Sequence, residues 1–136
     1  MKKALEVIGI IVVGSAILIG TFLYIARDRR EEQIRDYVNE KYKDLEKVAL
    51  DQLEGKNVEM PEKVVVINVY DNNFVEFATS GKEGFYYSKN NKPMANKNRD
   101  VDLLELGGNK YRWENDYNSG ITNKIRKHWY YYKVTK

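Results

Sequence analysis

The stretch VINVYDNNFVEFATSGKEGFYYSK, residues 66–89, decides the fold class of this chain. Runs of β-branched and aromatic residues alternate in it with short clusters of Asn, Asp, Ser and Gly, a pattern typical of strands separated by turns. We expect strands at residues 64–70, 74–79 and 85–89, with turns at residues 71–73 and 80–84. Strands joined by such short turns form an antiparallel meander.

The sequence that follows predicts more strands of the same sheet. Residues 90–100 are polar and contain Pro93, so we expect a surface loop there. The Gly107-Gly108 pair predicts a hairpin turn. We expect strands at residues 101–106 and 110–114, a second loop at residues 115–120 and a last strand at residues 125–134. Residues 56–136 would then form an antiparallel sheet of five to six strands.

The last expected strand carries aromatic rings on both of its faces. Because side chains alternate along a strand, Trp129 and Tyr131 would share one face, and His128, Tyr130 and Tyr132 the other. A strand of this kind is either central in its sheet or partly open to a partner.

Residues 27–54 predict one amphipathic helix that precedes the sheet. One face is apolar at a repeat near 3.6 residues, and the opposite face is densely charged. The positions on the apolar face are Ile34, Val38, Leu45, Val48, Ala49, Gln52 and Leu53, with Tyr37 and Tyr42 beside them. Gly55 supplies the C-terminal stop, and Pro61 prevents the helix from resuming. Packing this helix across the sheet would bury the apolar stripe and one sheet face.

Residues 5–26, LEVIGIIVVGSAILIGTFLYIA, are apolar except for Glu6 near their start. At about 1.5 Å per residue, a helix of this length crosses a hydrocarbon core of about 30 Å. The alternative is a cleaved signal peptide, but the segment is too long for one and no small-residue cleavage pattern precedes Arg27. The sequence therefore predicts a single-pass anchor in the lipid bilayer.

The charges that flank this anchor give opposite expectations for its orientation. Arg27, Arg29 and further arginines downstream outnumber the basic residues of the short tail at residues 1–4, which favours a cytoplasmic domain. The Met-Lys-Lys start, however, resembles bacterial signal anchors, and the chain has no cysteine. We expect the domain to be extracytoplasmic. Ala16 and Gly20 have a spacing that would allow self-association of the anchor.

Composition excludes several classes of site. The absence of cysteine excludes disulfides, thiolate metal sites, a cysteine nucleophile and a lipidated-cysteine anchor. The formal charge is only +3, so we expect no attraction to nucleic acid. Charge is nevertheless uneven, because acids outnumber bases in residues 31–62 and bases outnumber acids in residues 110–136. These two faces either meet one another or are solvated.

No group of residues has the pattern of an active site. Enzymes need a positioned acid, base, nucleophile or metal, and this chain has a single histidine, His128, and neither a G-x-S-x-G nor a G-x-x-x-x-G-K motif. Asp71, Asp100 and Asp102 come nearest to a cation site, but they lack the ligand spacing, the glycine and the terminal glutamate of a calcium loop. The sequence predicts a protein that is not an enzyme and that holds no metal and no cofactor.

Cations and aromatic rings mix toward the C-terminal end, where they form a candidate partner-binding surface. Such a surface could stack glycans or bases, or seat a protein partner. The candidate residues are Tyr111, Arg112, Trp113, Arg126, His128, Tyr130 and Tyr132. The alternative is that half of these rings belong to the core and the rest face lipid headgroups.

The order of anchor, charged amphipathic helix and sheet, with strings such as residues 66–89, resembles the cystatin-like or NTF2-like domains of small membrane-attached proteins of Gram-positive bacteria. Many of these are families of unknown function, so the resemblance implies a scaffold and no activity. The lipobox cysteine of related lipoproteins is missing.

The start of the apolar segment also resembles another class of protein. Leu5-Glu6-Val7, opening a long helix before a β-rich head, is similar to type IV pilins and pseudopilins, whose early glutamate pairs with a neighbouring N-terminus during assembly. The glycine and the cleavage site that precede the helix in those proteins are absent. An acid that simply lies at the membrane interface is the alternative explanation of Glu6.

These patterns predict an α+β protein with an anchor at residues 5–26, an amphipathic helix at residues 27–55 and a sheet at residues 56–136, the last two forming one domain. The function that fits is a membrane-tethered, non-enzymatic binding or accessory protein of the bacterial cell envelope, with another envelope protein as partner. A pilin-like subunit, or an immunity or exclusion protein of a mobile element, is the alternative.

Overall fold

The computed structural model describes residues 15–95 and 102–135. The chain divides into two units, Met1–Gln33 and Ile34–Lys136, and each is described here by itself. In the first unit, residues 15–33 are helical, and they begin the helix α2, Ser15–Leu53. Residues 5–14 of the expected anchor lie outside the described residues. Across the ranges that are described, no helix combines the length and the apolar character that crossing a membrane requires.

The second unit begins within α2 and contains the end of that helix. Gly55 lies just past the end with φ +76°, the left-handed conformation that glycine adopts without strain. The Gly55 N–H donates to the Gln52 carbonyl at 3.0 Å, and the Lys56 N–H donates to the Asp51 carbonyl at 2.9 Å. This pair of bonds is a Schellman motif, and it confirms the expected stop at Gly55.

The rest of the second unit is one antiparallel sheet of seven strands. The strands are β1 (Val66–Tyr70), β2 (Phe74–Ala78), β3 (Glu83–Ser88), β4 (Leu104–Gly107), β5 (Lys110–Glu114), β6 (Ser119–Arg126) and β7 (Trp129–Val134). Their spatial order is β1-β2-β3-β7-β6-β5-β4, so two meanders meet where β3 pairs with β7. The α+β class and the first meander are therefore confirmed, and β7 is central as its rings require.

Two turns form as their residues predict. In the turn after β1, Asp71 and Asn72 both have positive φ (52° and 59°), and the Asn73 N–H donates to the Tyr70 carbonyl at 3.1 Å. This is the pattern of a type I′ turn, which favours Asp and Asn. The β4–β5 turn uses positive φ at Gly107, Gly108 and Asn109.

The expectation of five to six strands with a single last strand is wrong, because the sheet has seven strands. The expected loop at residues 115–120 is shorter, covering residues 115–118 between β5 and β6. Residues 119–134 form the β6–β7 hairpin, whose turn contains His128 at φ +72°. No Gly or Asn marks this turn. Distant residues hold it instead: the His128 N–H donates to Asn91 Oδ1 at 2.9 Å, and the His128 ring Nδ1 lies 2.8 Å from the Ser88 carbonyl oxygen.

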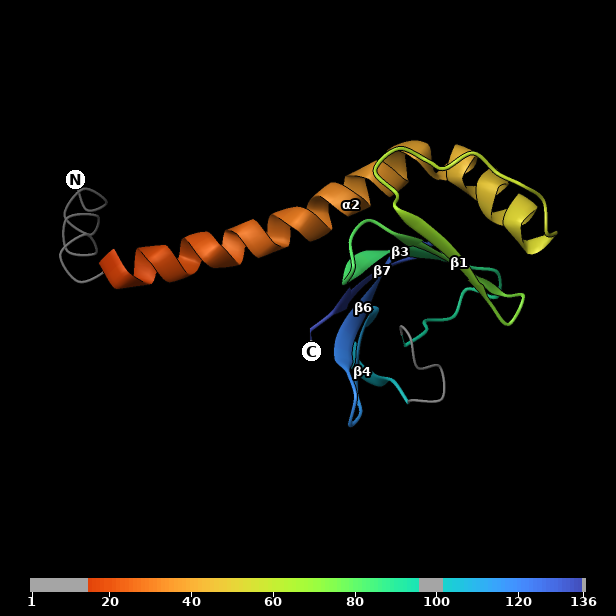
Figure 1. Ribbon diagram of the computed structural model, residues 1–136. Helices are drawn as coiled ribbons and strands as arrows, with labels where there is room; N and C mark the ends of the chain where they lie inside the picture. Colours follow the sequence, from red (N-terminus) through yellow and green to blue (C-terminus); the bar gives the residue numbers. More distant parts are fainter. Residues whose placement is uncertain (1–14, 96–101, 136) are drawn as a thin grey trace. The chain divides into compact units, whose positions relative to one another are not determined.

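A first core lies between the sheet and the part of α2 that belongs to this unit, which Figure 1 shows lying across one sheet face. This helix-face cluster consists of Val38, Leu45, Ala49, Val64, Val75, Phe77, Phe85, Tyr87 and Trp129. The expected apolar face of the helix is thus the buried one. Phe77 and Phe85 stack at a ring-centroid distance of 5.0 Å, a favourable geometry for buried aromatic pairs.

A second core covers the opposite face of the sheet. This far-face cluster consists of Tyr86, Met94, Ala95, Trp113, Tyr130, Tyr132 and Val134. The Tyr86 hydroxyl lies 2.6 Å from the Thr122 hydroxyl and accepts a hydrogen bond from the Met94 N–H at 2.9 Å. The segment after β3 is thereby fixed over the sheet, so the central strands β3 and β7 are buried on both faces although the described residues provide one helix.

Candidate functional site

Three of the seven residues expected to bind a partner belong to the far-face cluster. Trp113, Tyr130 and Tyr132 are brought together there and are at most 2% exposed. The Tyr130 hydroxyl donates to the Asn91 carbonyl at 2.9 Å, and the Trp113 indole N–H donates to Asn118 Oδ1 at 3.2 Å. The polar ends of these two rings are therefore satisfied within the protein, and their apolar surfaces pack in its core.

The other four residues are more exposed. Arg112 is exposed on β5, and Tyr111 next to it is half-buried. Arg126 lies with its guanidinium carbon 3.5 Å from the centre of the Tyr42 ring, so it connects β6 to α2. His128 lies in the β6–β7 turn, with its ring 5.5 Å from that of Tyr87.

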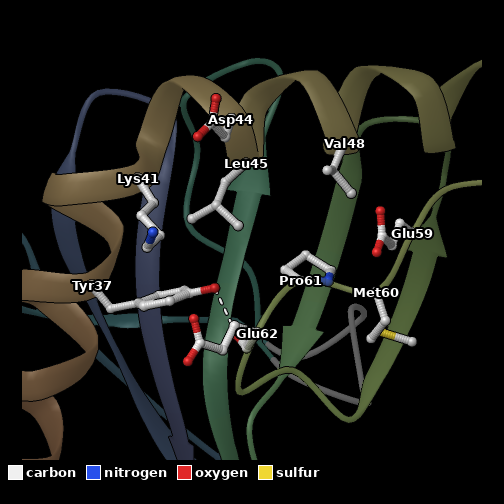
Figure 2. Close-up of a pocket in the computed structure, with 9 residues that line it drawn as sticks. All are labelled: Tyr37, Lys41, Asp44, Leu45, Val48, Glu59, Met60, Pro61 and Glu62. Atoms are coloured by element: carbon white, nitrogen blue, oxygen red, sulfur yellow. Dashed lines mark hydrogen bonds between the residues drawn. The ribbon is translucent and has the colours of Figure 1, made fainter.

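A groove of about 340 Å³ offers a better candidate site, and it is shown in Figure 2. We call it the α2–linker groove because it lies between α2 and the segment that links α2 to β1. Its walls are Tyr37, Lys41, Asp44, Leu45 and Val48 from the helix and Glu59, Met60, Pro61 and Glu62 from the linker. These residues lie 11 or more positions apart across the groove, so the site exists only in the folded chain.

The linker returns along the helix for reasons that its sequence explains. The Schellman motif at Gly55 ends α2, and Pro61 cannot extend it because proline has no N–H to donate. The Val64 N–H then donates to the Pro61 carbonyl at 3.2 Å, and Val64 itself is buried in the helix-face cluster. The linker is therefore fixed at both ends, and residues 59–62 are held opposite the helix.

Tyr37 joins the two walls of the groove. Its hydroxyl donates to the Glu62 carbonyl at 2.7 Å, the dashed line in Figure 2. Burial, and then the negative charge of Glu62, raise the pKa of the Tyr37 hydroxyl, so it stays protonated and able to donate. The Lys63 ammonium lies 5.8 Å from the centre of the same ring. This hydrogen bond fixes the position of the linker wall relative to the helix wall.

The groove is both apolar and acidic. Leu45, Val48 and Pro61 provide its apolar surface, and Met60 is 49% exposed at its edge. Asp44, Glu59 and Glu62 bring three carboxylates against the single ammonium of Lys41. A surface of this composition can bind a ligand through apolar contacts and electrostatic attraction. Within residues 15–95 and 102–135, no three His, Cys, Asp or Glu side chains lie close enough together to hold a metal ion.

No pattern in the sequence predicts this groove. Leu45 and Val48 were expected on the apolar face of the helix with Tyr37 beside it, but Pro61 was expected only to prevent the helix from resuming, and nothing was expected of Met60. The comparisons of the chain with protein-family models, with curated proteins and with solved structures find no match.

Proposed function

We propose that this protein is a membrane-tethered, non-enzymatic binding or accessory protein of the bacterial cell envelope, and that its α2–linker groove binds another envelope protein. The observation that carries the proposal is the groove itself, a concave surface that combines apolar side chains with three carboxylates and one ammonium. Ligand sites of proteins have this form, with apolar walls and a few placed polar groups.

The exposed Met60 at the edge of the groove supports a protein partner in particular. A methionine side chain is unbranched and polarizable, so it adapts to different apolar surfaces and is frequent in binding surfaces. The carboxylates around it would orient the partner and speed its association rather than supply most of the affinity. A partner with an apolar side chain flanked by basic residues fits both features.

The tether supports a function that depends on weak binding. The apolar sequence at residues 5–26 would hold the second unit at the membrane, where a partner in the same membrane is present at a high effective concentration. A groove of about 340 Å³ would then suffice without the area that a stable soluble complex needs.

One observation favours the pilin-like alternative. α2 runs without interruption from Ser15 to Leu53, so the helix that packs on the sheet is continuous with residues of the apolar segment. A pilin-like subunit uses such a helix for assembly. A processed, N-methylated N-terminus, detected by mass spectrometry of the intact protein, would decide for this alternative.

Crosslinking in cells tests the proposed function. A photoreactive benzoylphenylalanine placed at Met60 should give a discrete adduct with one envelope protein. The control places the same group at Tyr117, which is 87% exposed in the turn between β5 and β6 and away from the groove. Equal adducts from both positions, or none from Met60, would contradict a partner in the groove. The identity of the adduct would separate an accessory role from an immunity or exclusion role.

A further inference from the structure

The edge strand β1 is a second surface that can pair with another chain. β1 has a neighbour on one side only, because it is the first strand in the order of the sheet (Figure 1). Residues 64–70 contain no charge, and Val66 and Val69 are 45% and 37% exposed. Proteins usually place charges, proline or a bulge on such an edge to prevent pairing. β1 has none of these, so its edge is open to an added strand.

A hollow of about 180 Å³ lies at this edge, between β1 and the turn that joins β2 to β3. Val65, Val66 and Ala78 give it apolar walls, and Asn68, Glu76 and Tyr132 provide its polar groups. At about 30 Å³ for each water-sized group, the hollow has room for about six such groups, enough for the stem and head of one long side chain.

Glu76 is the charged group of this hollow, and it is only 3% exposed. Asn68 Nδ2 donates to its Oε1 atom at 2.9 Å, and the Tyr70 hydroxyl donates to the same atom at 3.2 Å. Tyr132 also bonds the carboxylate, and burial, followed by the charge of Glu76, raises the pKa of the Tyr132 hydroxyl. These donors are neutral, so within the described part of the chain the negative charge is held in place without a cation.

A buried carboxylate among neutral donors attracts a cation more strongly than a carboxylate in water does, because the surroundings screen the charge less. Oε1 already accepts from Asn68 and Tyr70, so a donor that enters the hollow would bond to the other carboxylate oxygen, Oε2. A lysine suits this site, because its apolar stem can lie along Val66 and Ala78 while its compact ammonium reaches the carboxylate.

We propose that β1 accepts an extended peptide segment as an eighth strand and that the hollow beside it takes a lysine side chain of that segment, with the lysine ammonium paired to the Glu76 carboxylate. Backbone bonds to β1 would provide affinity, and the hollow would provide selectivity. This site is separate from the α2–linker groove, so it stands or falls independently of the function proposed above.

Peptide binding to the full-length chain in detergent solution tests this proposal. The probe is an acetylated, amidated peptide of alternating valine and threonine with one central lysine, and the matched probe carries norleucine in place of lysine. We expect the lysine peptide to bind about tenfold more tightly, and we expect the amide NMR signals of β1 to shift with it. Equal affinities, or shifts confined to other strands, would overturn the proposal.

Two variants assign the selectivity to the hollow. Glu76→Gln keeps the shape and removes the charge, so the lysine peptide should fall to the affinity of the norleucine peptide. Val66→Lys places an ammonium at the mouth of the hollow from an exposed position, and it should reduce binding of the lysine peptide even if Glu76→Gln does not fold. Glu105→Gln, an exposed change on the opposite edge strand β4, should leave both affinities unchanged. Unaltered selectivity in Glu76→Gln or in Val66→Lys would refute the lysine site.

Discussion

Two glycines show how closely the far-face cluster is packed. A Cβ on Gly120 would lie 2.3 Å from Trp113 Cζ2 and 2.4 Å from the Lys133 carbonyl oxygen, so the Trp113 ring occupies the space that a side chain would need. A Cβ on Gly81, in the β2–β3 turn, would meet nothing within 4 Å. Packing therefore requires a glycine at position 120. This residue lies in β6, where the sequence predicted a loop.

This difference gives a matched pair of substitutions. Gly120→Ala should lower the free energy of unfolding by about 1–3 kcal/mol, because Trp113 or the backbone of β7 must move. Gly81→Ala should change it by less than about 0.5 kcal/mol, as ordinary surface changes do. Urea unfolding followed by tryptophan fluorescence measures both. Similar effects of the two variants would contradict the packing of Trp113 on Gly120.

The buried tyrosines should make the fold sensitive to alkali. Burial, and then the proximity of Tyr111, raise the pKa of Tyr130 to about 12. The stabilising effect of a raised pKa is complete below the ordinary value near 10 and is lost as the pH rises through about 12. We therefore expect the free energy of unfolding to fall between these pH values, and to fall less steeply in Tyr130→Phe. Tyr117→Phe, at an 87% exposed position, should leave the slope unchanged in urea titrations.

At the scale of elements, the patterns that depend on near neighbours in the sequence predicted the structure well. The stop at Gly55, the turn at Asp71 and Asn72 and the apolar face of the helix follow from local conformation and periodicity. The β6–β7 turn does not, because His128 is held in its left-handed conformation by Asn91 and Ser88, about 40 positions away. The groove could not be predicted for the same reason: it depends on residues distant in the sequence, such as Tyr37 and Glu62, which come into contact only after folding.

Arg126 joins the helix to the sheet, and this contact can be tested. Its guanidinium lies on the Tyr42 ring, and its Nη1 donates to Asn39 Oδ1 at 3.4 Å. Arg126→Ala should lower the free energy of unfolding by about 1–2 kcal/mol, because a partly buried cation–π contact and its apolar stem are lost. Lys127→Ala removes a neighbouring exposed cation and should have little effect. Equal losses in thermal unfolding would assign the effect to net charge rather than to the contact.

At the scale of the whole molecule, the sheet explains why so many aromatic residues are needed near the C-terminus. A central strand such as β7 has one core on each face, so Trp129 serves the helix-face cluster while Tyr130 and Tyr132 serve the far-face cluster. Three of the rings expected to form a binding surface, Trp113, Tyr130 and Tyr132, are therefore core residues. The α2–linker groove shares Leu45 with the helix-face cluster, but its carboxylates, Asp44, Glu59 and Glu62, have no part in that core, which makes them the more informative residues for function.

The proposed tether predicts how the intact protein behaves in cells. Because residues 5–26 are long and apolar enough for a bilayer, we expect the chain to stay in the membrane fraction after alkaline carbonate extraction, and a variant without residues 5–26 to be released. If the second unit is extracytoplasmic, protease added to cells with a permeabilised outer wall should remove it while a cytoplasmic marker stays intact. A domain that is protected in cells and becomes cleavable only after lysis would lie in the cytoplasm. Release of the full-length chain by carbonate would refute the tether. It would also remove the high effective concentration on which weak binding at the groove depends.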